Sequence, residues 1–152
     1  MKVGIAFSGG GLRGAYQVGC YKAFLDCGIN VNGFVGTSIG SFNAAMCASN
    51  RFYELYNFWY NESTGSILGF SDKLINKANS NEYDMKLLME ILEKVKNIVV
   101  SKGISTINIR KKLEEFNISK YLYKSKKDCG LVTVRASDFK PRYMFKEDIP
   151  AN

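Results

Sequence analysis

Gly36-Thr37-Ser38-Ile39-Gly40 is the stretch of sequence that decides the fold of this chain. It follows a short apolar run, Gly33-Phe34-Val35, and precedes small and apolar residues typical of a packed helix, Ile39 to Ser49. Strand, sharp turn and helix with a serine on the turn form the G-x-S-x-G nucleophile elbow. Gly36 and Gly40 allow close approach of strand and helix, and the serine is expected in a strained, exposed conformation at a helix N-terminus. The pattern predicts Ser38 as a nucleophile, with a chance match as the competing interpretation.

A second glycine-rich segment precedes the elbow. It follows a compact apolar run, Val3 to Phe7, and leads into a helix pattern from Leu12 to Cys27, with Gly28 fitting the C-cap. Strand, helix, strand and helix within about fifty residues predict right-handed βαβ units and a parallel sheet. Both glycine segments would then lie at the carboxyl ends of neighbouring strands, where α/β sheets place their sites.

The segment Gly9-Gly10-Gly11-Leu12-Arg13-Gly14 satisfies G-x-G-x-x-G and could bind a dinucleotide. A dinucleotide site, however, needs an acidic residue at the end of the second strand, and that strand is followed here by Gly36-Thr37-Ser38. A Walker A loop is excluded because Gly14 is followed by Ala15 rather than by lysine. In an acyl-transfer site, the backbone N–H groups of Gly9, Gly10 and Gly11 would form an oxyanion hole beside Ser38. Arg13 and Gly14 would bind an anion or support the loop, and a plain surface arginine is an equal alternative.

The residue inventory limits the chemistry. The sequence has no histidine, so a Ser-His-Asp triad is excluded, and the most economical base for Ser38 is an aspartate. The four cysteines form no C-x-x-C pair and indicate reduced thiols. We therefore expect neither a metal site nor a cofactor.

The two motifs together resemble the patatin-like phospholipase family. The resemblance rests on Ser8 to Gly14, on Ala15-Tyr16-Gln17-Val18-Gly19, on the Gly36 to Gly40 elbow and on their spacing. It is specific over residues 1–48 and weaker at Val134 to Asp138. The resemblance implies a three-layer α/β/α fold with a mostly parallel central sheet. It also implies hydrolysis of lipid acyl esters by a Ser-Asp dyad, with an oxyanion hole from the glycine loop.

One family feature is not present in this sequence. The family's aspartate lies in an Asp-Gly-Gly or Asp-Gly-Ala motif, and none of the aspartates here precedes glycine: Asp26, Asp72, Asp84, Asp128, Asp138 and Asp148. We therefore expect the fold to be incomplete at the C-terminus, with the catalytic aspartate beyond Asn152 and this chain alone inactive. Asp138 is the best substitute by position, but a turn role in Asp138-Phe139-Lys140-Pro141 is favoured.

Length and charge bound the remaining possibilities. A length of 152 residues fits one domain, residues 1–152. The net charge is +7, and basic residues gather between Arg110 and Lys127, where a solvated surface is favoured over contact with an anionic membrane. The apolar run at the N-terminus is too short for the core of a signal peptide. No apolar run in the sequence has the length of a membrane span. We expect a cytoplasmic protein that acts on lipid or phospholipid, possible peripheral membrane contact, and no nucleic-acid partner.

The rest of the chain predicts further elements. An aromatic-rich helix is expected from Arg51 to Tyr60, and it could line an acyl channel or pack in the core. Further helices are expected at Glu82–Val100 and Ile107–Phe116, and a strand pair at Gly130–Ala136 and Arg142–Phe145. Besides a lipid hydrolase, two functions remain open: a non-catalytic acyl- or anion-binding domain that keeps the elbow, and a nucleotide-binding domain that uses Gly9–Gly14.

Overall fold

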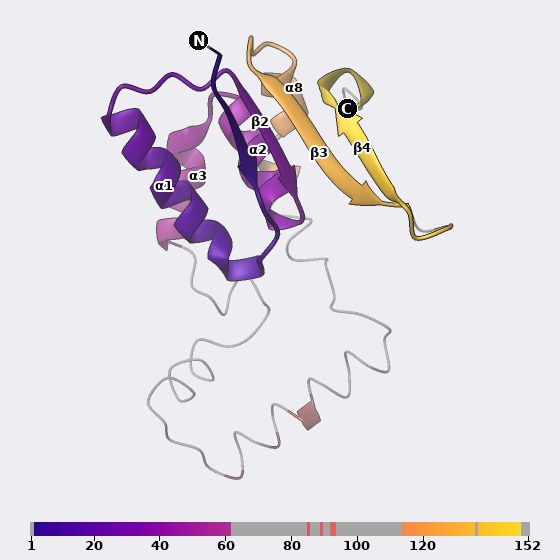
Figure 1. Ribbon diagram of the computed structural model, residues 1–152. Coiled ribbons are helices and arrows are strands. Elements are labelled where there is room, and N and C mark those ends of the chain that lie inside the picture. Colours follow the sequence, from indigo (N-terminus) through magenta and orange to yellow (C-terminus); the bar gives the residue numbers. More distant parts are fainter. Residues whose placement is uncertain are drawn as a thin grey trace. The chain divides into compact units, whose positions relative to one another are not determined.

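The computed structural model describes residues 2–61, 85, 89, 92–93, 114–135 and 137–149 of the 152-residue chain. The chain divides into two compact units, one made of Met1–Asn61 with Asn117–Asn152 and the other of Glu62–Phe116. The first unit carries every predicted site residue (Figure 1). The prediction of one domain over the whole length stays a prediction.

The first unit is built on an open four-stranded sheet with the order β1-β2-β3-β4 (Figure 1). Its strands are β1 (Gly4–Phe7), β2 (Gly33–Thr37), β3 (Asp128–Val134) and β4 (Pro141–Phe145). Strands β1, β2 and β3 run parallel, and β4 pairs antiparallel with β3. The predicted α/β class with a mostly parallel sheet and the predicted hairpin are confirmed. The first hairpin strand begins at Asp128 rather than Gly130, because its parallel pairing with β2 starts there, at Gly33.

The helices of this unit are η1 (Gly11–Arg13), α1 (Gly14–Asp26), α2 (Ile39–Ala48), α3 (Phe52–Asn61), α8 (Ile118–Leu122) and η2 (Lys146–Asp148). The first three predicted helices are therefore confirmed to within a few residues, and the short α8 was not predicted. Gly28 ends α1 with φ 72°, and the N–H groups of Gly28 and Ile29 donate to the carbonyls of Leu25 and Phe24. This is the glycine-terminated helix end that the sequence predicted.

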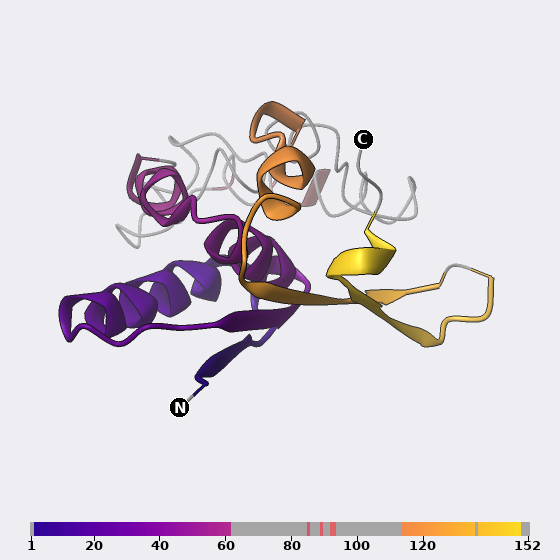
Figure 2. The ribbon, with the colours of Figure 1, turned by 90° about the horizontal axis from the view of Figure 1, so that it is seen from above.

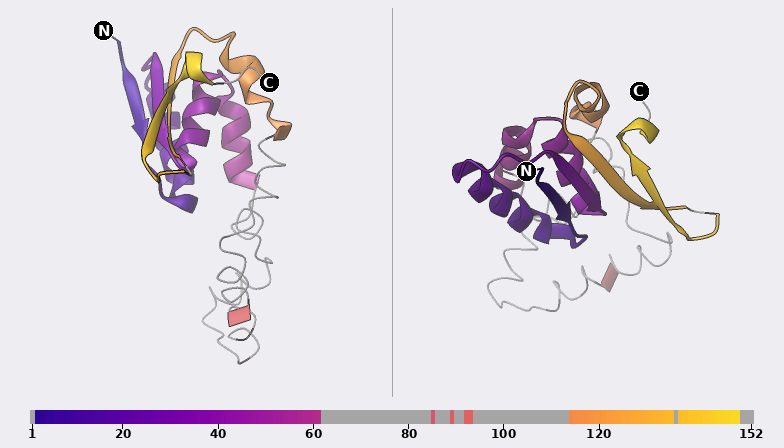
Figure 3. Two further views of the ribbon diagram at one scale, coloured as in Figure 1. Left: turned by 90° about the vertical axis from the view of Figure 1, so that its right-hand side faces the viewer. Right: turned by 45° about the horizontal axis from the view of Figure 1, so that its top comes forward.

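The helices α1, α2, α3 and α8 lie on one side of the sheet (Figure 2), where α2 packs directly on the strands and α3 and α8 pack against the other helices. The left view in Figure 3 shows α2 and α8 on the same side of the strands. Of the three layers implied by the resemblance, the part of the chain that the structure describes contains two, the sheet and one helical layer. Helix α2 is central because its small residues let it lie close to β2 and β3.

The core lies between the sheet and these helices. The ring of Tyr21 from α1 makes edge contacts with Phe34 of β2 and Phe52 of α3, with centroid distances of 5.0 and 5.2 Å. Met46 of α2, Leu55 of α3 and Leu122 of α8 are also fully buried. The aromatic helix thus contributes to the core through Phe52, whereas Tyr53 and Tyr60 are exposed. Its use as an acyl channel stays a prediction.

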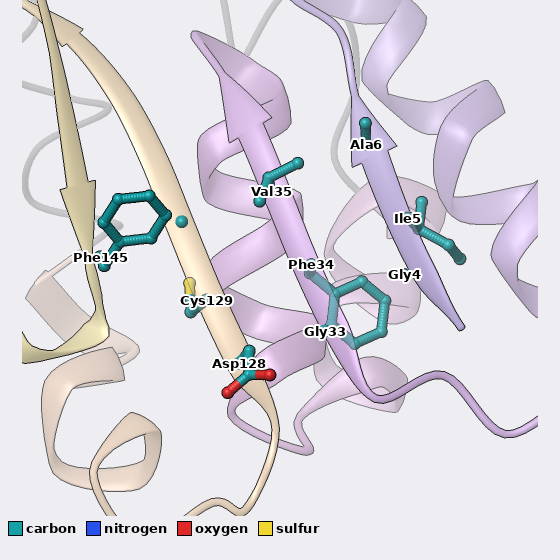
Figure 4. Close-up of a pocket in the computed structure, with 10 residues that line it drawn as sticks. Gly4, Ile5, Ala6, Gly33, Phe34, Val35, Asp128, Cys129 and Phe145 are labelled. Carbon is teal, nitrogen blue, oxygen red and sulfur yellow. The ribbon is translucent and has the colours of Figure 1, made fainter. Parts of the chain in front are cut away.

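The opposite face of the sheet carries an open apolar groove of about 410 Å³ (Figure 4). Three glycines on neighbouring strands line the groove: Gly4, Gly33 and Gly130. Because glycine has no side chain, the groove is open there, and Val35 and Phe145 beside it are 44% and 54% exposed. The groove is formed by strand residues rather than by the loops that follow the strands. It is separate from the predicted site.

Several predictions fall on other parts of the chain. Most of the helices expected at 82–100 and 107–116 lies outside the described residues, as do Arg110, Lys111 and Lys112 of the basic cluster. Among the residues that are described, no helix has the length and apolar character needed to cross a membrane.

Candidate active site

The structure brings the two glycine segments together at one edge of the sheet. The register of β1 and β2 pairs Phe7 with Gly36, so the two segments that follow these strands leave the sheet side by side. A Cβ built on Gly9 would lie 3.2 Å from the Cβ of Ser38. The glycine loop and the elbow therefore form one site, as expected for loops after neighbouring parallel strands.

Ser38 has the backbone conformation of a strained turn residue. Its φ of 54° and ψ of −128° are sparsely populated for a residue with a side chain. It directly precedes α2, its carbonyl accepts the Ser41 N–H at 2.9 Å, and it is exposed. The first N–H groups of α2 and the helix dipole thus lie beside the serine, where they favour negative charge.

The elbow leaves no space for side chains at its two glycines. A Cβ on Gly36 would overlap the carbonyl of Gly40 and lie 2.6 Å from the backbone nitrogen of Ser41. A Cβ on Gly40 would lie 2.6 Å from the carbonyl oxygen of Ser8. The Ser41 hydroxyl also donates to the carbonyl of Gly36 at 2.7 Å, which closes the turn. Both predicted elbow glycines are therefore required by backbone approach.

The glycine loop is exposed and turns into α1 through one 3₁₀ turn. Gly9, Gly10 and Gly11 are exposed, Gly11 has φ 56°, and the Arg13 N–H donates to the Gly10 carbonyl at 3.1 Å. The aliphatic part of Arg13 runs beside Gly10, since a Cβ built there would lie 3.4 Å from that of Arg13. This position fits loop support, and the anion-binding role of Arg13 stays a prediction.

Gly14 packs closely against neighbouring side chains, which fits loop support, and its anion-binding role stays a prediction. It is buried at the start of α1, and a Cβ there would lie 2.6 Å from Cζ2 of Trp59 and 3.0 Å from Cγ1 of Ile39. The indole ring of α3 therefore rests directly on the backbone where the glycine loop ends.

Asp138, the best-placed aspartate within the chain, is engaged in its own turn. Its carboxylate accepts the Lys140 N–H at 3.2 Å and lies 3.6 Å from the guanidinium of Arg135. These are the contacts of a turn residue between β3 and β4. Within the described ranges, the Ser38 side chain makes no capping hydrogen bond. The same residues contain no group of three or more histidine, cysteine or carboxylate side chains that could hold a metal.

The buried cysteines are poor alternative nucleophiles. All four cysteines are free thiols. Burial raises the pKa of Cys47 to about 12 and that of Cys129 to about 11, so both remain protonated near neutral pH. Because the thiolate is the reactive form, Ser38 is a better nucleophile candidate than these two buried thiols.

Three side chains near the site were missed by the sequence reasoning: Gln17 of α1, Asn43 of α2 and Trp59 of α3. They are linked by hydrogen bonds that reach Ser8. Asn43 is fully buried within the otherwise small and apolar α2. A polar residue in such a run must find partners when it is buried, which is the signal that could have identified it.

The chain is similar to proteins of a known family. A family model described as Patatin-like phospholipase matches residues 5–148. A segment of 51 residues is 45% identical to patatin-like phospholipase domain-containing protein 7 of Rattus norvegicus, covering 34% of this chain and 4% of that protein. A segment of 46 residues is 50% identical to lysophospholipase nte1 of Aspergillus terreus, covering 30% of this chain and 3% of that protein. No solved structure matches the chain.

Proposed function

Because this chain belongs to the patatin-like phospholipase family, we propose that it provides the nucleophile and the oxyanion hole of a serine hydrolase that cleaves lipid acyl esters. The observation that carries the proposal is the strained Ser38 at the start of α2, in contact range of the glycine loop. Hydrolysis of lipids agrees with the family and with the names of the relatives. The dyad, the oxyanion hole and the substrate are the proposed details.

In the proposed reaction, Ser38 Oγ attacks the acyl carbonyl carbon and gives its proton to a carboxylate base. The N–H groups of Gly9, Gly10 and Gly11 stabilise the tetrahedral oxyanion, together with the N-terminus of α2. The C–O bond to the alcohol then breaks, and the alcohol leaves with the proton. Water hydrolyses the acyl-serine by the same steps in reverse order. With no histidine in the sequence, the base is an aspartate outside the described residues.

The name of the fungal relative suggests a substrate class for the test. Lysophospholipase nte1 is named for lysophospholipids, so we propose a single-chain phospholipid as substrate. The full-length protein should release fatty acid from lysophosphatidylcholine, and a fluorophosphonate probe should label Ser38, as located by peptide mass spectrometry. Probe attachment elsewhere, or no fatty acid from any acyl ester, would leave an acyl-binding domain as the better interpretation.

The 152-residue chain alone is expected to react slowly with the same probe. A serine hydroxyl without a neighbouring base is a weak nucleophile, and Asp138 is held in its own turn. Labelling rates of the chain and of its Asp138→Asn variant should be similarly low. Fast labelling that disappears in Asp138→Asn would identify Asp138 as the base and contradict the proposal that the base lies outside the described residues.

We also propose peripheral contact with anionic lipid surfaces. The exposed basic residues near α8 are Lys120, Lys124 and Lys126. Lys127, in contrast, turns inward: its Nζ lies 3.5 Å from the Tyr21 hydroxyl and 5.4 Å from the Phe34 ring centroid, and burial lowers its pKa. Among the described lysines of this cluster, the three exposed ones are therefore those that can contact a membrane.

Binding to phosphatidylserine vesicles should weaken as salt rises, because surface charge is screened over about 8 Å at physiological ionic strength. Each exposed lysine near a membrane contributes about 1 kcal/mol, so Lys124→Gln with Lys126→Gln should weaken binding about tenfold or more. Lys22→Gln, on α1, is the control for loss of a lysine outside this surface; it removes a charge that is paired with Asp26. Cosedimentation measures the binding. Equal affinity for phosphatidylserine and phosphatidylcholine vesicles at low salt would contradict the proposal.

A further inference from the structure

We propose that Gln17, Asn43 and Trp59 are positioning residues that fix the peptide of the glycine loop nearest Ser38. This inference rests on the proposed hydrolase function. The side chains form one continuous chain of hydrogen bonds. Trp59 Nε1 donates to Asn43 Oδ1 at 2.9 Å, Asn43 Nδ2 donates to Gln17 Oε1 at 3.1 Å, and Gln17 Nε2 donates to the Ser8 carbonyl at 2.7 Å.

The direction of this chain is determined by chemistry. The indole N–H can only donate, so it requires the oxygen of the Asn43 amide. Asn43 Nδ2 also donates to the Gly14 carbonyl at 3.0 Å, and a carbonyl can only accept, which fixes the same orientation a second time. The Gln17 oxygen then accepts from Asn43, and its nitrogen remains to donate to Ser8. Since Asn43 is 0% exposed, water does not compete for these bonds at the centre of the chain.

The last bond of the chain acts on a peptide group that belongs to the oxyanion loop. The Ser8 carbonyl and the Gly9 N–H are part of the same planar trans peptide, so they point in opposite directions. Holding the carbonyl with Gln17 therefore fixes the direction of the Gly9 N–H. Gln17 Nε2 also lies 3.3 Å from the Ser8 hydroxyl, which restrains the same residue further. Glycine flanks this peptide on its C-terminal side, so the peptide would otherwise rotate easily.

The other end of this series of hydrogen bonds, at Trp59 and Asn43, holds the backbone of Gly14, the last residue of the glycine loop. The Trp59 ring covers Gly14, and Asn43 holds the carbonyl of Gly14. These hydrogen-bonded side chains therefore hold the loop at Ser8 and at Gly14, and they connect both points to α2, the helix that directly follows Ser38. A displaced oxyanion donor weakens binding of the transition state more than binding of the substrate.

The test uses the full-length protein and an acyl ester. Gln17→Met keeps the length of the side chain but removes both hydrogen bonds, and Gln17→Glu keeps the acceptor for Asn43 but cannot donate to Ser8 while ionised. Both should lower kcat by about 10- to 100-fold with KM nearly unchanged, because displacements of this kind cost up to about 10²-fold. Trp59→Phe keeps an aromatic side chain but removes the indole N–H and the ring atoms Cζ2 and Cη2 that cover Gly14. Because Trp59 acts on Ser8 only through Asn43 and Gln17, this variant should lower kcat less. Lys22→Met, half-buried on the same helix, is the control, because it removes only an ion pair with Asp26.

Each outcome decides the inference. Retained kcat in Gln17→Glu would overturn it, since the donor to Ser8 would then be dispensable. A lower melting temperature of the Gln17 variants, together with a lower kcat and a raised KM, would show that Gln17 has a structural role. That result would also overturn the inference. If a Gln17 variant does not fold, kcat of Trp59→Phe decides, and an unchanged value contradicts the proposal. Ser38→Ala distinguishes failure of the proposed hydrolase function from failure of this inference. Residual activity of Ser38→Ala would contradict the proposed function. Full activity of Gln17→Met alone would contradict only the positioning role.

Discussion

Ser38→Ala is expected to lower kcat for lipid ester hydrolysis by about 10⁶-fold, which is the effect of removing the nucleophile from a serine hydrolase. The remaining groups, the loop amides and the N-terminus of α2, can stabilise an oxyanion but cannot form an acyl-enzyme. Fatty-acid release from lysophosphatidylcholine by the full-length protein measures kcat. Labelling by a fluorophosphonate probe should disappear in parallel.

The backbone of Ser38 provides an independent control for this variant. The φ of 54° is unfavourable for both serine and alanine, so Ser38→Ala should unfold at the same temperature as the native protein. Glycine adopts this conformation without strain, so Ser38→Gly should be more stable than Ser38→Ala by about 1 kcal/mol and equally inactive. Loss of activity with stability kept or raised identifies a catalytic role. Turnover above about 1% of the native rate in either variant would contradict the assignment of the nucleophile.

The elements that lie close to one another in the sequence could be predicted because their signals are local. The glycine segments, the apolar runs before them and the small residues of α2 determine β1, α1, β2 and α2 with little ambiguity. The strain at Ser38 and the contact between the two loops follow from the same pattern, since parallel strands must end at one edge.

What the sequence did not predict depends on contacts between distant residues. Lys127 belongs to a basic run, and its inward position against Tyr21 and Phe34 appears only when β3 pairs with β2. The start of β3 at Asp128 has the same origin, because pairing decides a strand end more than composition does. Gln17, Asn43 and Trp59 are on three different helices, and their hydrogen bonds depend on how those helices pack.

Gly36→Ala is expected to destabilise the fold by about 3 kcal/mol or more, at or above the upper end of overpacking costs. The added methyl group would overlap the Gly40 carbonyl, and it would lie 2.6 Å from the Ser41 nitrogen. Both neighbours are backbone atoms of the first turn of α2, so no side chain can rotate away. The strand and the helix must separate, which also displaces Ser38. We expect the melting temperature to fall by about 10 °C, at about 2–4 °C per kcal/mol for a protein of this size.

Gly19→Ala is the matched control, because it makes the same chemical change in a different environment. Gly19 lies within α1, and a Cβ there would meet no atom within 4 Å. Alanine favours the helix over glycine by about 0.5–1 kcal/mol, so this variant should melt higher than the native protein. Urea denaturation of both variants then compares the same added methyl group with and without a backbone neighbour. If Gly36→Ala were as stable as Gly19→Ala, the close approach of β2 and α2 at the elbow would be wrong, and the strained geometry assigned to Ser38 would lose its physical cause.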